Sequence, residues 1–245
     1  MKEAAFITKG SQPINRYFTD HMLSKGCMVT TLFDDSSEAD AYYASLADDV
    51  KDRFFPICGI PEQSADIVDM IEQAIQQMGG LHYLIHGIDV INEEEQYERN
   101  AVQFGISMES LFRDLFLYNR SVGSYMARKK EGRIVFPLLS DVLYYIDCPN
   151  SPILNHGKIA MMKTLAKELA PFRIAVNAVT FGYHTAMPSS LNTKEIKHRQ
   201  EIHALKPYLP QMEEMFPILN LLMQAPAHLI SGQNLHVGAG LDTVI

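Results

Sequence analysis

The chain has 245 residues, of which 47% are hydrophobic and 20% are charged, and its formal net charge is −8. This length suffices for one large α/β domain, and the acidic balance argues against a nucleic-acid partner, whose phosphates attract clustered Lys and Arg. No apolar run approaches the ~20 residues that span a bilayer, and the N-terminus lacks the apolar core of a signal peptide. The three cysteines lie far apart and indicate neither a zinc site nor a disulfide framework. We therefore expect a cytoplasmic protein that does not contact a membrane.

Apolar runs alternate with amphipathic segments along the chain. Helical periodicity is clearest over 64–80, where Gly79 is expected as the C-cap, and over 157–171, where Pro171 ends the pattern. Strands that alternate with helices require crossover connections and a parallel sheet. The sequence therefore predicts a single doubly wound, Rossmann-like α/β domain over 1–245, with helices on both faces of a seven-stranded parallel sheet. The expected strands are Ala4–Ile7, Met28–Phe33, Phe54–Ile57, Tyr83–His86, Arg133–Phe136, Ala175–Val179 and Asn234–Val237.

The segment 185–222 interrupts this rhythm, because it is polar and contains four prolines. Ligands of open α/β sheets bind at the carboxyl ends of the strands. One interpretation of the segment is therefore a helical lid over that edge. The other is a surface excursion with no gating role.

The first turn, "TKGSQPIN" (8–15), stands where a nucleotide-binding βα unit carries a glycine-rich loop. Pro13 removes one backbone N–H from the groups that could meet a phosphate. Lys9, Ser11 and Arg16 could still form an anion site at the start of the next helix. The alternative is that these side chains are simply exposed and solvated.

Four stretches together resemble the short-chain dehydrogenase/reductase superfamily, and within it the 3-oxoacyl-acyl-carrier-protein reductases. They are "QMGGLHYLIHG" (77–87), "EGRIVF" (131–136), "LAKELAPFRIAVNAVTFGYHTAM" (165–187) and "LISGQNLHVGAG" (229–240). The resemblance covers essentially the whole chain. It implies a doubly wound fold, NAD(P) as the cofactor, and a Ser-Tyr-Lys set in which Tyr gives its proton to a carbonyl oxygen.

The cofactor motifs of that family are altered here. Its pattern T-G-x-x-x-G-I-G places Lys9, Pro13 and Asn15 at the three glycine positions, and its N-N-A-G motif becomes "HGID" (86–89). The adenine-side Asp falls on Gly59, and the structural Asn falls near Leu111. The remaining positions outline a residual cleft. Asp34 could bind a ribose there, or it could simply belong to a solvated loop. Its residues are Thr8, Gly10, Ser11, Ile14, Asp34, His86, Gly87 and Gly182.

The catalytic positions are altered as well. An ungapped alignment places Ser151 at the Tyr position, Asn155 at the Lys position and Leu139 at the Ser position. A gapped alignment brings Lys158 to the Lys position but Leu154 to the Tyr position. Relocated catalytic candidates are Ser140, Tyr144, Tyr145 and Lys158. No metal site is expected, because His86, His156 and His184 lack metal-ligand spacing.

These losses favour an atypical, catalytically degenerate member of the superfamily, without bound NAD(P), that acts as a ligand-binding, scaffold or regulatory protein. One alternative is an NAD(P)H-dependent 3-oxoacyl or carbonyl reductase with relocated catalytic residues. Another is a cofactor-independent lyase similar to the halohydrin dehalogenases. The family resemblance also implies a homo-oligomer, a dimer or tetramer, and the apolar side chains of 108–130 and 159–169 suit either that surface or the core.

Overall fold

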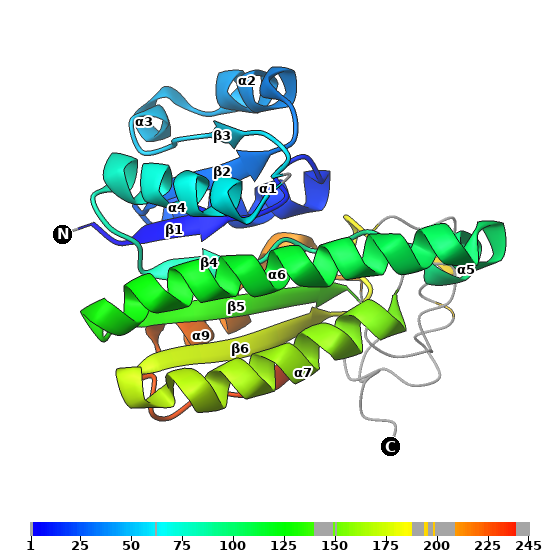
Figure 1. Cartoon of the computed structure of the whole chain (residues 1–245). Helices are drawn as coiled ribbons and strands as arrows, with labels where there is room; N and C mark the ends of the chain where they lie inside the picture. The colour runs from blue at the N-terminus through cyan, green and yellow to red at the C-terminus, as the bar shows by residue number, and fades with distance from the viewer. Residues whose placement is uncertain are drawn as a thin grey trace.

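The computed structural model describes residues 2–61, 63–139, 149, 151–187, 194–195, 198 and 209–238 (Figure 1). Seven parallel strands form one sheet in the order β3-β2-β1-β4-β5-β6-β7. This confirms the predicted sheet. The strands are β1 (Ala4–Ile7), β2 (Met28–Phe33), β3 (Ile57–Cys58), β4 (Tyr83–Ile85), β5 (Gly132–Leu139), β6 (Ile174–Phe181) and β7 (Asn234–Val237).

Six expected strands overlap the observed ones along most of their length, although β4 ends one residue earlier and β5 and β6 run further at both ends, and the third strand is displaced. The prediction there was Phe54–Ile57, whereas β3 is Ile57–Cys58 and Phe54 forms only an isolated bridge with Val29. Pro56 explains the difference, because a proline has no N–H to donate to a neighbouring strand.

The helices also follow the predicted alternation. Gly79 caps α4 with φ of 74°, as expected. The helix expected from 157 begins earlier, because Pro152 occupies its first turn and the Ser151 side chain accepts a hydrogen bond from the Leu154 N–H. The described helices are α1 (Pro13–Ser24), α2 (Ser36–Ser45), α3 (Asp48–Lys51), α4 (Ser64–Met78), α5 (Glu93–Arg99), α6 (Ala101–Lys129), α7 (Pro152–Leu169) and α9 (Pro217–Gln224), with 3-10 turns η1 (Ala170–Phe172) and η2 (Met212–Met215).

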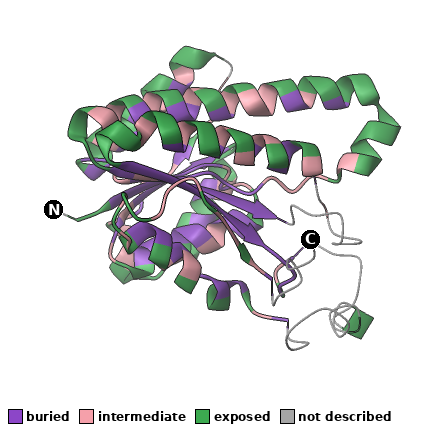
Figure 2. Cartoon of the chain, turned by 90° about the horizontal axis from the view of Figure 1, so that it is seen from below, coloured by how far each residue is buried: buried purple, intermediate pink, exposed green. Residues whose placement is uncertain are grey.

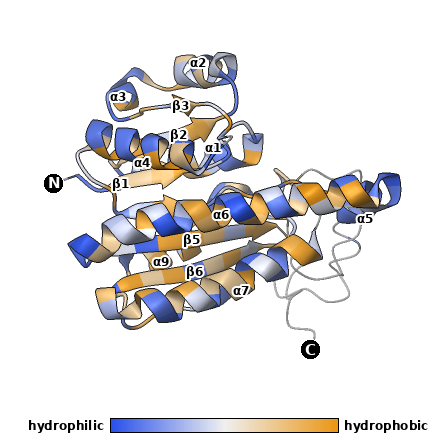
Figure 3. Cartoon of the chain, viewed as in Figure 1, coloured by the Kyte–Doolittle hydropathy of each residue, from blue (hydrophilic) through white to orange (hydrophobic). Residues whose placement is uncertain are grey.

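The sheet lies between two helical layers. Helices α4, α6 and α7 cover one face, and α1 and α9 cover the other (Figure 1). Buried side chains concentrate on the strands and the inner helix faces (Figure 2), and the strands are also the most hydrophobic elements (Figure 3). All residues of β1 are fully buried, as expected for a central parallel strand.

The longest described part of the expected lid, 209–222, belongs largely to the core. Met212, Phe216 and Leu219 are buried, and the ring of Phe216 lies 5.6 Å from that of Phe18 on α1. Helix α9 confirms a helical segment over 217–222. Residues 188–193, 196–197 and 199–208 of the expected lid lie outside the described residues. Within the described chain, none of the helices combines the length and apolar character needed to cross a membrane.

Candidate functional site

The candidate site lies where β1 and β4 end. From these two central strands the chain order runs outward in opposite directions, through β2 and β3 on one side and through β5, β6 and β7 on the other. In open α/β sheets, ligands bind in the crevice beyond the carboxyl ends of the strands at such a switch point. The turns after β1 and β4 therefore form the walls of the expected crevice.

The turn after β1 is held close to β2. Lys9 adopts a left-handed φ of 61°. The Gly10 N–H donates to the Leu32 carbonyl at 2.6 Å. A Cβ atom on Gly10 would lie 2.5 Å from Thr31 Cγ2, so only glycine permits this approach.

The three polar side chains considered for an anion site are bound to different protein groups. Ser11 Oγ accepts a hydrogen bond from the Asp34 N–H at 2.9 Å. Arg16 Nε donates to the Gly10 carbonyl at 3.3 Å. Lys9 forms an ion pair with a carboxylate of the facing turn. The structure thus uses each of them to hold the turn together.

The turns after β1 and β4 are joined directly across the crevice. Thr8 Oγ1 accepts from the Gly87 N–H at 2.8 Å, and a Cβ atom on Gly87 would lie 2.5 Å from the Thr8 carbonyl oxygen. The fully buried Asn15 side chain donates to the carbonyls of Lys9 and Ile88 and accepts from the Ile88 N–H. Hydrogen bonds and a close backbone contact therefore join the two turns at the switch point.

A buried ion cluster lies beside this contact. The Asp89 carboxylate binds Lys158 Nζ at 2.5 Å through one oxygen and Lys9 Nζ through the other. Lys158 also donates to the Gly87 carbonyl at 3.4 Å. The exposed fractions of the side chains are 5% for Asp89, 1% for Lys158 and 32% for Lys9. Burial opposes ionisation of Asp89, but the two ammonium groups outweigh it and lower its pKa to about 2.

His86 lies fully buried at the end of β4. Its Nε2 is 3.1 Å from Asn119 Oδ1, and its ring centroid is 4.4 Å from that of Phe136. Burial lowers the pKa of His86 to about 3. Family alignment indicated an Asn near Leu111, but the buried Asn of α6 is Asn119, two turns further along. A polar residue on the apolar face of that helix was the available signal.

The N-terminus of α7 is capped by the first residue of α5. Glu93 Oε2 accepts hydrogen bonds from Ser151 Oγ at 2.7 Å and from the Ile153 N–H at 2.9 Å. One turn later, Asn155 Nδ2 donates to the Leu139 carbonyl at 2.9 Å. Sequence reasoning missed Glu93, because nothing in "NEEEQYER" distinguishes it from neighbouring exposed glutamates.

The turn after β6 forms the far side of the same edge. The Gly182 N–H donates to the Val237 carbonyl at 2.9 Å. Away from this edge, Asn177 in the middle of β6 accepts a hydrogen bond from the N–H of Gln233, the residue before β7, at 3.1 Å. His184 is buried, and burial lowers its pKa to about 4. Across the described residues, no group of three His, Cys, Asp or Glu is placed to hold a metal ion.

A family model described as Enoyl-(Acyl carrier protein) reductase matches residues 14–242. The chain belongs to the short-chain dehydrogenase/reductase superfamily. The 3-oxoacyl-(acyl-carrier-protein) reductase FabG of Staphylococcus aureus is 22% identical, with 98% of each chain covered. FabG of Aquifex aeolicus is 23% identical, with 98% of this chain and 97% of the relative covered.

A solved structure shares the fold over the whole chain. An apo SCOR enzyme from Clostridium thermocellum superposes with a TM-score of 0.79, covering 100% of this chain and 95% of that chain at 16% identity. At this identity the similarity establishes the fold and nothing finer. The activity has to be argued from the residues at the superfamily's positions.

At those positions, the described residues have structural partners. Ser151, at the Tyr position, is the N-cap of α7. Asn155, at the Lys position, binds the β5 carbonyl of Leu139, which is the residue at the Ser position. Lys158 lies one turn beyond Asn155 and also faces inward, since both are buried. The candidates Ser140, Tyr144 and Tyr145 lie outside the described residues.

Proposed function

We propose that the chain is an atypical short-chain dehydrogenase/reductase homologue that does not reduce carbonyl compounds with NAD(P)H. It acts in the cytoplasm as a ligand-binding, scaffold or regulatory protein. The observation that carries the proposal is the direct contact between the turns after β1 and β4, where Gly87 approaches Thr8 and Asn15 more closely than any Cβ atom would allow. That contact lies where the superfamily holds its dinucleotide.

The residues of the first turn fit a dinucleotide poorly. A pyrophosphate needs free backbone N–H groups at the start of α1. Here the N–H groups of Gly10, Gln12 and Asn15 donate to protein carbonyls, and Pro13 has none. The Asn15 side chain also stands at a glycine position of the superfamily and joins the two turns.

The catalytic positions support the same conclusion. A serine hydroxyl at position 151 cannot replace a tyrosine as proton donor, because it is far less acidic and already donates to Glu93. Asn155 carries no charge that could lower the pKa of a neighbouring hydroxyl. The three substitutions at 139, 151 and 155 each serve the packing or capping of β5 and α7.

A second candidate function is an NAD(P)H-dependent reductase with relocated residues. Lys158 favours it, because its ammonium group reaches the turn after β4 from only one turn beyond the usual lysine position. Such an enzyme would need a proton donor from elsewhere, for which Tyr144 and Tyr145 are the candidates.

A turnover assay distinguishes the two functions. Oxidation of NADPH is followed by absorbance with a 3-oxoacyl thioester as substrate, and Aquifex aeolicus FabG serves as the positive control. We expect no turnover above background for this chain. Turnover that is abolished by Tyr145→Phe or Tyr144→Phe would establish the second candidate and refute the first.

We also propose that the protein self-associates through α6. Along this helix, one seam advances by alternating steps of four and three residues, the spacing of a helix–helix contact. Its apolar members Val102, Ile106 and Phe116 are 75%, 54% and 56% exposed. The seam comprises Val102, Ile106, Glu109, Arg113, Phe116, Arg120, Gly123 and Ala127.

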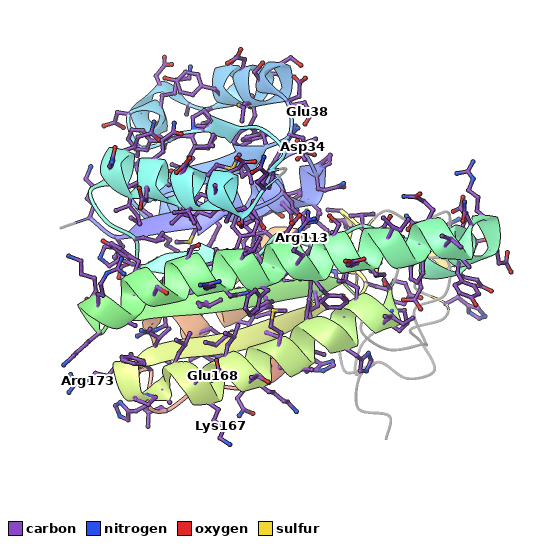
Figure 4. All side chains as sticks on the ribbon, in the orientation of Figure 1. Asp34, Glu38, Arg113, Lys167, Glu168 and Arg173 are labelled. Carbon is purple, nitrogen blue, oxygen red and sulfur yellow. The ribbon has the colours of Figure 1, made fainter. Side chains whose placement is uncertain are left out.

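The seam is self-complementary when two copies of α6 run antiparallel. In the register that pairs position 113 with 116, Ile106 meets Gly123 of the other copy, and Glu109 meets its Arg120. Gly123 and Arg120 line a groove of about 430 Å³ between α6 and α7. Figure 4 shows Arg113 on α6 and, on α7, Glu168, which also lines this groove.

Charge reversal tests this register. Glu109→Arg and Arg120→Glu should each lower the oligomer mass measured by sedimentation equilibrium, and the double variant should restore it. Glu98→Arg, an exposed reversal outside the seam, is the matched control. A monomeric wild type, or a double variant no better than the single ones, would refute the proposed contact.

A further inference from the structure

Two ammonium groups converge on one point of the crevice from different parts of the chain. Lys9 belongs to the turn after β1, and Lys158 belongs to α7. Both bind the carboxylate of Asp89, which comes from the turn after β4. Each carboxylate oxygen has its own ammonium partner, and Asp89 is 5% exposed. The arrangement is that of a small anion held between two cations.

This cation pair stands at the sheet's switch point, beside the start of α1. Parallel-sheet proteins bind the anionic groups of their ligands at this place, because the crevice and a helix N-terminus coincide there. The two lysines carry one more positive charge than the single carboxylate neutralises. Without Asp89, the same two groups would form a doubly positive and largely buried pocket.

We infer that the Asp89 carboxylate is the built-in occupant of an anion-binding site formed by Lys9 and Lys158. Asp89 is thus a specificity-determining residue, which excludes phosphate and carboxylate groups from the crevice and restricts native ligands to uncharged ones. The inference rests on the proposed function, since it explains how a superfamily member loses affinity for a dinucleotide and names the ligand class that remains.

The geometry makes the exclusion both electrostatic and steric. A ligand phosphate would have to displace a carboxylate that holds both ammonium groups at hydrogen-bonding distance. It would also meet the repulsion of that carboxylate at short range. A neutral ligand meets neither obstacle, because it needs no counter-charge.

The experiment measures binding of inorganic pyrophosphate by isothermal titration calorimetry. Wild type and the exposed control Asp69→Asn should bind pyrophosphate more weakly than about 1 mM. Asp89→Asn keeps the side-chain shape but frees both lysines, and should bind at least about tenfold more tightly. Equal affinity in wild type and Asp89→Asn, with both proteins folded by circular dichroism, would overturn the inference.

A charge-matched variant keeps the inference testable if Asp89→Asn does not fold. Lys158→Met/Asp89→Asn leaves only the partly exposed Lys9, so no buried charge lacks a partner, and its cluster has the same net charge as wild type while the anion site is vacated. It should still bind pyrophosphate more tightly than wild type, and failure to do so would overturn the inference. Titration of NADPH into the wild type separates the two claims. Tight NADPH binding refutes the proposed function. Weak NADPH binding, together with variants that bind pyrophosphate no more tightly than wild type, refutes only the role of Asp89.

Discussion

Replacing Lys158 by Met tests whether the buried ion cluster stabilises the fold. The substitution keeps the length of the side chain and removes the ammonium group that lies 2.5 Å from Asp89. Breaking a buried ion pair costs about 3–5 kcal/mol, because the remaining charge is left without its partner. Lys9 still binds Asp89, so we expect the lower end of this range, about 3 kcal/mol. A loss of that size lowers the melting temperature of a chain this long by about 6–12 °C.

The assay is urea unfolding at pH 7, followed by circular dichroism and checked by calorimetry. Lys163→Met, an exposed lysine on the same helix, is the matched control and should change stability by less than about 0.5 kcal/mol. The double variant Lys158→Met/Asp89→Leu should recover most of the loss, because neither buried charge remains. Equal stability of Lys158→Met and Lys163→Met would refute the view that Lys158 supports the ionised Asp89.

Two further perturbations probe the same edge of the sheet. Burial lowers the pKa of His86 from 6.5 to about 3 and that of His184 from 6.5 to about 4. As the pH falls, the unfolded chain therefore binds protons before the folded chain does. The free energy of unfolding should decrease between pH 6.5 and pH 4 by about 1.4 kcal/mol per pH unit for each histidine. His184→Gln should roughly halve that slope in urea titrations, whereas the control His156→Gln should leave it unchanged. A wild-type free energy of unfolding that does not vary with pH over this range would contradict the burial argument. Gly87→Ala should lose about 1–3 kcal/mol by overpacking against Thr8, while Gly105→Ala, where a Cβ atom meets nothing within 4 Å, should lose none.

The sheet was predictable because central parallel strands form short, continuous apolar runs. Ala4–Ile7 and Met28–Phe33 are such runs, and both bounds agree with the structure. The third strand was misplaced because Pro56 interrupts the apolar run, and its effect on pairing depends on which neighbour it meets. Local pattern therefore determined the architecture but not every register.

The site itself was predictable only as a set of altered positions. Asp89 and Lys158 are 69 residues apart, and no local pattern indicates that they pair. A gap within a helix would rotate its apolar face away from the core, which argues against the gapped alignment that brings Lys158 to the Lys position. In the structure, Asn155 and Lys158 are both buried, since residues three apart share a helix face. Lys158 thus reaches the crevice without any rotation.

The most direct test of the central claim is a binding titration with the unmodified dinucleotides. NADPH and NADH are titrated separately into the wild-type protein, and binding is read from the change in nicotinamide fluorescence. The joined turns after β1 and β4 predict no saturable binding at micromolar concentrations of either dinucleotide. Saturable binding with a dissociation constant in the micromolar range or tighter would contradict the proposal that this crevice no longer holds a dinucleotide.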